Sequence, residues 1–304
     1  MIQTIQLPNA PCHWVHLDAE DADPGELDRL ASDWQIPPDW LGAVLDPDAI
    51  ARAKTTGDGP QFIALLYPLP LSPDGLSYAT RLLGICWCSD RVLTATARTA
   101  PFLDELMADC SEGRRTPSSI TALILEIAEA TARHFIEVTR LIDTERSRLV
   151  DRLTHSTRTE HLIRLSQLQT SLVYFDQAVA ENHPIYHHLG QLDVVASSEH
   201  HNNRLAAVLQ SSQQAEKMVH QSATMLANLN ATYSGIVSNR LNVIMKRLTA
   251  LTIILTVPTI VGAFWGMNVT LPFAGHPLAF WALVGLSVLL CLLIVLLLGR
   301  RDLL

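Results

Sequence analysis

Residues 248–268 read LTALTIILTVPTIVGAFWGMN, a stretch that is apolar almost throughout and contains no charged residue. Asp, Glu, Lys and Arg stay absent up to residue 299, and a second apolar run fills 278–298. As helices, runs of 19 and 21 residues would be about 28 and 31 Å long, close to the ~30 Å hydrocarbon core of a bilayer. We therefore expect two transmembrane helices, at about 248–266 and about 278–298, joined by an outer loop at 267–277.

Basic residues flank these two runs on one side only. Lys246 and Arg247 precede the first run, Arg300 and Arg301 follow the second, and the loop between the runs contains no basic residue. Because positively charged flanks stay in the cytoplasm, both chain ends are predicted to be cytoplasmic and the loop to lie outside. This pattern predicts a multi-pass protein of the cell inner (plasma) membrane, in contact with the lipid bilayer.

The chain ahead of these runs has the composition of a water-soluble body. Residues 1–110 hold 16 acidic and 6 basic residues, a balance that argues against a nucleic-acid partner. The five cysteines are scattered and fit neither a zinc site nor a disulfide framework, which favours a reducing cytoplasm. We find no P-loop, no nucleophile motif and no carboxylate pair placed for acid–base chemistry, so an enzyme is not expected.

Two kinds of pattern divide this body. Strand-like and helix-like runs alternate near the start, at 13–18, 24–34, 37–46, 61–69, 79–89 and 91–97. This alternation predicts an α/β domain at 1–115. From Ser118 to about Glu181, apolar residues recur every three or four positions, which indicates one long helix that Ser118 or Ser119 can cap and that Pro184 breaks.

No proline occurs between Gly190 and Pro258, and a seam of small and apolar residues runs along this segment. The seam consists of Val208, Ser212, Ala215, Val219, Ser222, Leu226, Leu229, Tyr233 and Ile236. It predicts a single helix that continues into the membrane. The expected fold is an α+β membrane protein with an α/β domain, a long-helix stalk at 116–247 and a transmembrane domain at 248–304.

The first apolar run carries a polar line that the second run lacks. Its members are spaced by three and four residues and so share one helix face: Asn242, Met245, Thr249, Thr252, Thr256 and Thr259. Threonine hydroxyls in membrane helices often bond carbonyls of their own helix. A line of this length also predicts a pore lining. Because one such helix cannot enclose water, a pore would need several copies of the chain in a ring.

The stretch SNRLNVIMKRLTALTIILTVPTIVGAFWGMN (238–268) resembles the inner helix of CorA-type magnesium transporters, of the CorA/ZntB metal ion transporter superfamily, which ends in Gly-Met-Asn. The resemblance rests also on Pro258 within the helix and on the short second run with its basic end. Further matching stretches are WVHLD (14–18), LDPDAIARA (45–53) and SLVYFDQAV (171–179). The resemblance therefore covers essentially the whole chain.

This resemblance implies a funnel-shaped homopentamer that carries Mg²⁺ and other divalent cations inward down the electrochemical gradient. Gly266, Met267 and Asn268 would form the outer selectivity filter, with Asn268 meeting the hydrated ion. Pore-lining and gate positions would be Asn242, Met245, Leu248, Thr249, Thr252, Thr256 and Thr259. Because Mg²⁺ gives up its water reluctantly, a ring of amide and carbonyl oxygens that bonds its water shell suits this ion.

The chain departs from this family pattern in two places. The outer loop VTLPFAGHP (269–277) has no acidic residue, only His276. Family members sense cytoplasmic Mg²⁺ through acidic residues between subunits, whereas the stalk at 194–246 holds only Glu199 and Glu216. We therefore assign no ligand to a regulatory metal.

Two alternatives stay open at this point. One is a Zn²⁺ transporter of the same superfamily, with Co²⁺ or Ni²⁺ as further ions, because the histidines at 183, 187, 188, 200 and 201 could bind Zn²⁺ or Ni²⁺. His183 and His187 have ligand spacing only if the helix continues through Pro184, and surface or capping roles are favoured. A membrane-tethered helical sensor without transport would explain the stalk, but not the threonine line or the uncharged Gly-Met-Asn loop.

Overall fold

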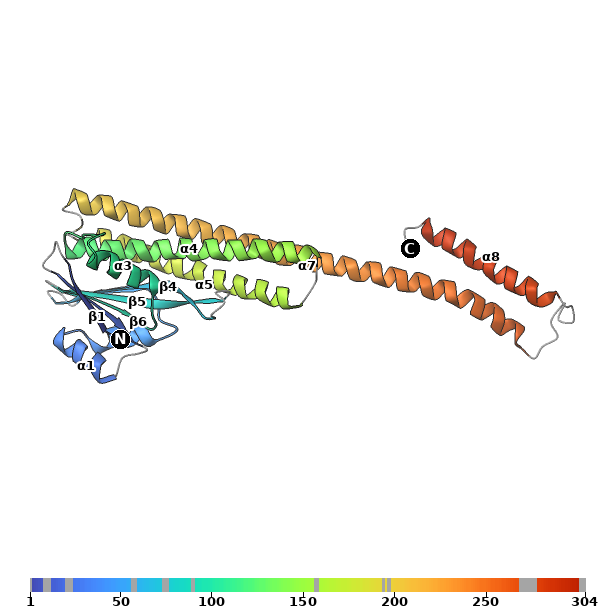
Figure 1. The fold of residues 1–304 in the computed structure, drawn as a ribbon, viewed down its shortest axis with the longest axis horizontal. Helices are drawn as coiled ribbons and strands as arrows, with labels where there is room; N and C mark the ends of the chain where they lie inside the picture. Colours follow the sequence, from blue (N-terminus) through green and yellow to red (C-terminus); the bar gives the residue numbers. More distant parts are fainter. Residues whose placement is uncertain are drawn as a thin grey trace. The chain divides into compact units, whose positions relative to one another are not determined.

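The structure is a computed structural model that describes residues 2–7, 12–19, 24–55, 59–72, 77–88, 91–155, 159–192, 195, 198–267 and 278–300. These residues form two compact units that divide after Asn228 (Figure 1). The first unit contains a mixed α/β layer and long helices. The second contains the end of one long helix and the last helix of the chain.

A six-stranded sheet forms the base of the first unit. Its strands are β1 (Ile2–Gln6), β2 (His13–Asp18), β3 (Arg52–Thr55), β4 (Gln61–Pro70), β5 (Tyr78–Cys88) and β6 (Arg91–Thr96). Their order is β1-β2-β6-β5-β4-β3, and every neighbouring pair is antiparallel except β2 and β6. The strands expected at 13–18, 61–69, 79–89 and 91–97 are confirmed as β2, β4, β5 and β6. The edge strands β1 and β3 were missed because both are short: β1 has five residues and is mostly exposed, and β3 has four residues and is mostly half-buried.

Helices cover both faces of this sheet. They are α1 (Pro24–Asp33), α2 (Pro38–Leu45), α3 (Pro101–Ser111), α4 (Ile120–His155) and α5 (Thr159–Gly190), and Figure 1 shows α3, α4 and α5 on one side and α1 on the other. Trp40 of α2 stacks on Phe62 of β4 at 5.1 Å between ring centroids. Neighbouring residues on the same strand, such as Ile63 and Leu65, join the core beneath α4 and α5 instead. β4 is buried on both faces, which explains its continuous apolar run.

The prediction of one helix from Ser118 to Glu181 was wrong. The structure has two helices there, since α4 ends at His155 and α5 begins at Thr159. The two share the same apolar period, and both bury that face against the sheet, so periodicity alone does not reveal the reversal. The N-terminal cap is confirmed, because Ser119 Oγ accepts a hydrogen bond from the Ala122 N–H at 3.1 Å.

The predicted break at Pro184 was also wrong. Pro184 lies inside α5, which continues to Gly190. Proline removes one helical hydrogen bond and so weakens a helix interior. Here Ile185, Tyr186 and Leu189 follow the proline and are buried in the core, and this packing holds the last turns in helical form.

α7 (Glu199–Trp265) is one helix of 67 residues, as the proline-free segment predicted. Up to Asn228 it packs on α4 and α5, and the predicted seam residues in this part are buried: Val208, Ser212, Ala215, Val219, Ser222 and Leu226. Ser222 Oγ donates a hydrogen bond to Asp143 of α4 at 2.9 Å. Farther along the same seam, Ile236 is exposed.

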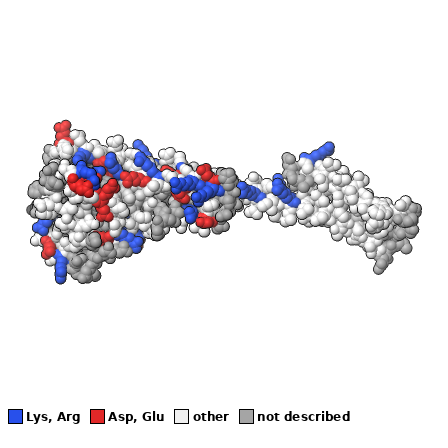
Figure 2. All heavy atoms as spheres, in the orientation of Figure 1, with Lys and Arg blue, Asp and Glu red and all other residues white. Residues whose placement is uncertain are grey.

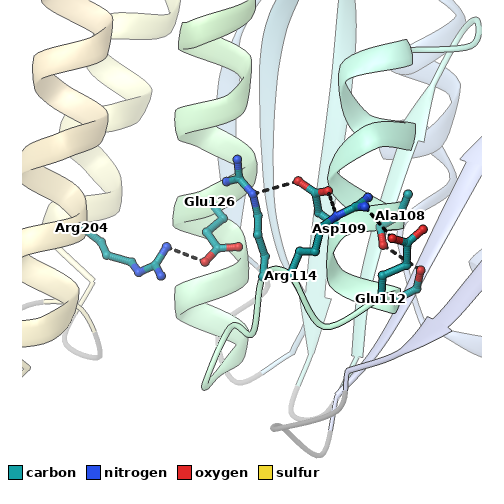
Figure 3. A network of polar contacts seen from close by, with 8 residues as sticks. Ala108, Asp109, Glu112, Arg114, Glu126 and Arg204 are labelled. Carbon is teal, nitrogen blue, oxygen red and sulfur yellow. Dashed lines mark hydrogen bonds and ion pairs between the residues drawn. The ribbon is translucent and has the colours of Figure 1, made fainter.

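An ion pair between a partly exposed arginine and a buried carboxylate anchors the first turns of α7. Figure 3 shows Arg204 reaching from α7 to Glu126 on α4, beside a separate set of contacts between Arg114, Asp109 and Glu112 near the end of α3. Glu126 is 3% exposed, and burial raises the pKa of its carboxyl group while Arg204 opposes that shift. Because a buried charge needs a partner, this pair ties α7 to α4 at a defined register.

Two histidines of the first unit, the buried His16 and the half-buried His134, are uncharged. His16 Nδ1 lies 3.0 Å from Thr94 Oγ1, and His134 Nε2 lies 3.2 Å from the carbonyl oxygen of Pro68. Burial lowers the pKa of each imidazole from 6.5 to about 4. Both rings are therefore neutral at physiological pH.

Candidate ion pathway

The second unit contains two helices long and apolar enough to cross a membrane, the end of α7 and α8 (Ala279–Gly299). Figure 2 shows charged side chains spread over the sheet-containing unit and few on the unit that contains α8. In water, the large apolar side chains of these helices would be exposed, for example Leu255, Trp281 and Leu296. Their exposure is the pattern of surfaces that face lipid or other protein chains.

α8 covers one face of α7. The α7 residues on this face are buried or half-buried, namely Ala250, Ile254, Val257, Val261 and Trp265. Cys291 of α8 contacts the backbone of Ile254, which places α8 on this side. At 100° per residue, the line from Thr249 to Thr259 lies about 140–220° around the helix from Ile254. The threonine line therefore lies on the face opposite α8.

Three of the four threonines bond to their own helix. Thr252 and Thr256 donate hydrogen bonds to the carbonyl oxygens of Leu248 and Thr252 at 2.9 and 2.7 Å. Thr259 donates in the same way to Leu255 at 2.9 Å. The alternative that these hydroxyls bond the helix backbone is thus confirmed for these three residues. Each of these hydroxyls donates its only hydrogen to a carbonyl of α7, so toward any other group its oxygen can act only as a hydrogen-bond acceptor.

The remaining predicted pathway residues fall at the ends of this line. Asn242, Met245 and Leu248 are exposed on α7. The helix ends at Trp265, after which the Gly266 N–H bonds the Gly262 carbonyl at 3.0 Å and the Met267 N–H bonds that of Phe264 at 3.5 Å. Asn268 and loop residues 269–277, His276 included, lie outside the described residues. Gly266 and Met267 thus follow directly on the end of the helix.

Sequence reasoning missed one residue of this unit. Pro258 has no N–H, so the carbonyl of Ile254, four residues earlier, loses its partner within the helix. Cys291 Sγ of α8 lies 3.5 Å from that oxygen and donates to it. In the sequence, Cys291 is one of five scattered cysteines and does not stand out. The one available signal is Pro258, which indicates that the carbonyl of Ile254 needs a hydrogen-bond donor from outside its helix.

Metal-binding side chains are sparse in the described part of the chain. Those residues contain no group of three or more His, Cys, Asp or Glu that could hold a metal ion. His201 contacts the capping residue of α4, because its Nε2 lies 3.0 Å from Ser119 Oγ. Glu199 and Glu216, the two acids of the predicted stalk, are both exposed.

A family model described as "CorA-like Mg2+ transporter protein" matches residues 10–301. The chain belongs to this CorA family. The cobalt/magnesium transport protein CorA of Methanocaldococcus jannaschii is 23% identical over 305 residues, which cover 95% of this chain and 90% of that relative. CorA proteins are ion transporters of membranes, so the prediction that the chain is not an enzyme is confirmed.

Solved structures share this CorA fold. The complete CorA magnesium transporter from Methanocaldococcus jannaschii has a TM-score of 0.82 at 22% identity, over 97% of this chain and 92% of that one. The full-length CmaX protein has a TM-score of 0.70 at 17% identity, over 96% and 88%. At these identities the likeness shows the fold alone. It confirms the predicted class, with an N-terminal α/β domain, a long helix and two C-terminal apolar helices.

Proposed function

We propose that this CorA-family chain forms a channel that conducts Mg²⁺ passively into the cytoplasm. The observation that carries the proposal is the line from Thr249 to Thr259, which lies on the face of α7 opposite α8. Because the polar line does not face α8, it can face the α7 helices of other copies of the chain. α8 would then face the lipid around the ring.

The hydroxyl chemistry suits a hydrated cation. Thr252, Thr256 and Thr259 have used their hydrogens on carbonyls of α7, so their oxygens can only accept. The water molecules around Mg²⁺ point their hydrogens outward and need acceptors of this kind. A lining of acceptors therefore favours Mg²⁺ with its water shell, which this ion sheds reluctantly. An anion would find no donor at these three hydroxyls.

We assign the filter and gate from their places along α7. Gly266, Met267 and Asn268 follow the end of the helix and would form the outer ring, with the Asn268 amide on the water shell of the ion. Met245 and Leu248 are large, apolar and exposed, and would close the inner end by excluding water. A divalent ion gains about 4.6 kcal/mol per 100 mV on entry, so no ATP is needed.

The exposure of α7 supports self-assembly of the chain. Between residues 234 and 249 every residue is exposed except the half-buried Val237, and the segment includes Leu241, Ile244 and Met245. Exposed apolar side chains in a row mark a surface that packs against other protein chains, and copies of the same chain in a ring would supply them. We propose a homopentamer with a cytoplasmic α/β domain (1–115), a stalk (116–247) and a transmembrane domain (248–304). Both chain ends would then be cytoplasmic.

Co²⁺ is a second candidate ion. The relative from Methanocaldococcus jannaschii is named for cobalt as well as magnesium transport. Co²⁺ also carries a shell of water molecules, so the same acceptor lining would serve it. Competition between the two ions in one flux assay would rank them.

The test is ion flux into liposomes that hold the purified full-length protein. We expect wild-type protein to admit Mg²⁺ and Asn268→Ala to lose most of that flux. Thr256→Val removes one acceptor per chain and should lower the flux. The matched control is Thr224→Val, because Thr224 makes the same type of bond, to the His220 carbonyl at 2.9 Å, outside the threonine line. Wild-type protein without flux would favour the sensor alternative, and full flux in Asn268→Ala would refute the filter assignment.

A further inference from the structure

Two histidine side chains on α5 lie side by side, and their Nε2 atoms are in contact. His183 and His187 lie one turn apart, with 3.1 Å between their Nε2 atoms and 4.7 Å between their ring centroids. Ligand spacing for this pair requires that the helix continue through Pro184, and α5 does continue to Gly190. The structure therefore brings two imidazole nitrogens together on one helix face.

The gap between these nitrogens fits a metal ion. Imidazole binds Zn²⁺ at about 2.0–2.1 Å, so two nitrogens on one ion lie about 2.9 Å apart at a right angle and about 3.3 Å apart at the tetrahedral angle. The observed 3.1 Å falls between these two values. Binding of one ion by both nitrogens would therefore require little change in the distance between them. In the metal-free protein, one Nε2 carries the hydrogen that the other accepts. When an ion binds, this ring would change tautomer by proton exchange with water, so that its hydrogen is on Nδ1 and both neutral rings offer an Nε2 lone pair.

We propose that His183 and His187 form a chelating site for a divalent cation that prefers imidazole, namely Ni²⁺, Cu²⁺ or Zn²⁺. Mg²⁺ is a hard ion that prefers oxygen ligands, so this site would not take the ion proposed for the channel. The site lies in the sheet-containing unit and is separate from the threonine line on α7. It depends on no part of the proposed transport function.

The groups around His183 and His187 determine how tightly the pair can bind a metal ion. His187 is exposed, so an ion can reach the site from solvent. The described residues offer no third His, Cys, Asp or Glu in position, and water would fill the other coordination places. His183 Nδ1 is buried without a hydrogen-bond partner among the described residues. A metal-bound histidine binds more tightly when its second ring nitrogen donates a hydrogen bond to an acceptor. Because Nδ1 of His183 has no such acceptor among the described residues, we expect a lower metal affinity than in a structural zinc site.

The test uses full-length protein in detergent, titrated with Ni²⁺ alone and followed by calorimetry. We expect His187→Gln to weaken the tightest binding event at least tenfold, and His183→Gln to do the same. His188→Gln is the matched control, since His188 is also exposed but is adjacent in sequence and points to another side of α5. Circular dichroism of each variant verifies that the helices are intact.

A second readout identifies the ligands directly. With Cu²⁺ added at one equivalent, the electron paramagnetic resonance spectrum of wild-type protein should show two coordinated nitrogens, and that of His187→Gln should lose this pattern. Unchanged Ni²⁺ affinity in both His183→Gln and His187→Gln would overturn the proposal. So would an equal loss of affinity in His188→Gln, or wild-type protein that binds no Ni²⁺. None of these results depends on Mg²⁺ flux.

Discussion

The contact between Cys291 and Ile254 predicts a specific energetic coupling to Pro258. Cys291→Val keeps a side chain of similar size but removes the S–H that serves the Ile254 carbonyl. Hydrogen bonds between helices inside a membrane protein contribute on average about 0.6 kcal/mol and at most about 1.7 kcal/mol. We therefore expect the substitution to lower the folded-to-unfolded ratio about 3- to 16-fold, with the weak S–H donor nearer the lower value.

A second substitution tests the cause. Pro258→Ala restores an N–H four residues after Ile254, so the carbonyl regains a partner within α7. In that background Cys291→Val should have almost no effect. The two effects are compared in a double-mutant cycle, by reversible unfolding of the full-length protein in mixed micelles with increasing sodium dodecyl sulfate.

The control is Ser287→Ala, which changes a half-buried polar residue on the same face of α8. Its effect should be the same with and without Pro258. The reasoning is refuted if Cys291→Val destabilises both backgrounds equally, because its contribution would then be packing alone. It is also refuted if the substitution is neutral in the wild-type background.

Two further predictions concern the sheet-containing unit. The imidazoles of His16 and His134 have their pKa lowered to about 4, so they stabilise the fold above pH 6.5 and this contribution disappears as the pH falls toward 4. When the pH falls from 7 to 5, protonation linked to each of the two histidines should lower the free energy of unfolding by about 2 kcal/mol. In thermal unfolding, His134→Gln should remove about half of the combined pH dependence. Equal melting temperatures of the wild-type protein at pH 7 and pH 5 would contradict this prediction. Arg204→Met leaves Glu126 buried without its partner and should lower the unfolding free energy by about 2–3 kcal/mol, somewhat below the range for fully buried pairs because Arg204 is partly exposed. Adding Glu126→Gln should recover most of that loss in denaturant titrations, and failure to recover it means that the pair is not the cause.

Local patterns were sufficient for the elements whose signal lies in neighbouring residues. The strand at His13–Asp18, the buried run of β4 and the 67-residue course of α7 all follow from composition and periodicity. The four-residue strand β3 was missed because it is too short to carry a period. For the ion pathway, the threonine line is likewise a local pattern, readable from spacing alone.

The sequence by itself determined the two apolar helices, the polar line on the first of them and the family to which the chain belongs. Only the tertiary structure decided that α4 and α5 are separate helices, that α5 passes through Pro184, and that α8 covers the face of α7 opposite the threonines. It alone brought Cys291 to the Ile254 carbonyl. The physical reason is that periodicity shows which face of a helix is apolar or polar. What covers that face depends on packing between residues distant in the chain, and packing also decides whether a helix survives a proline.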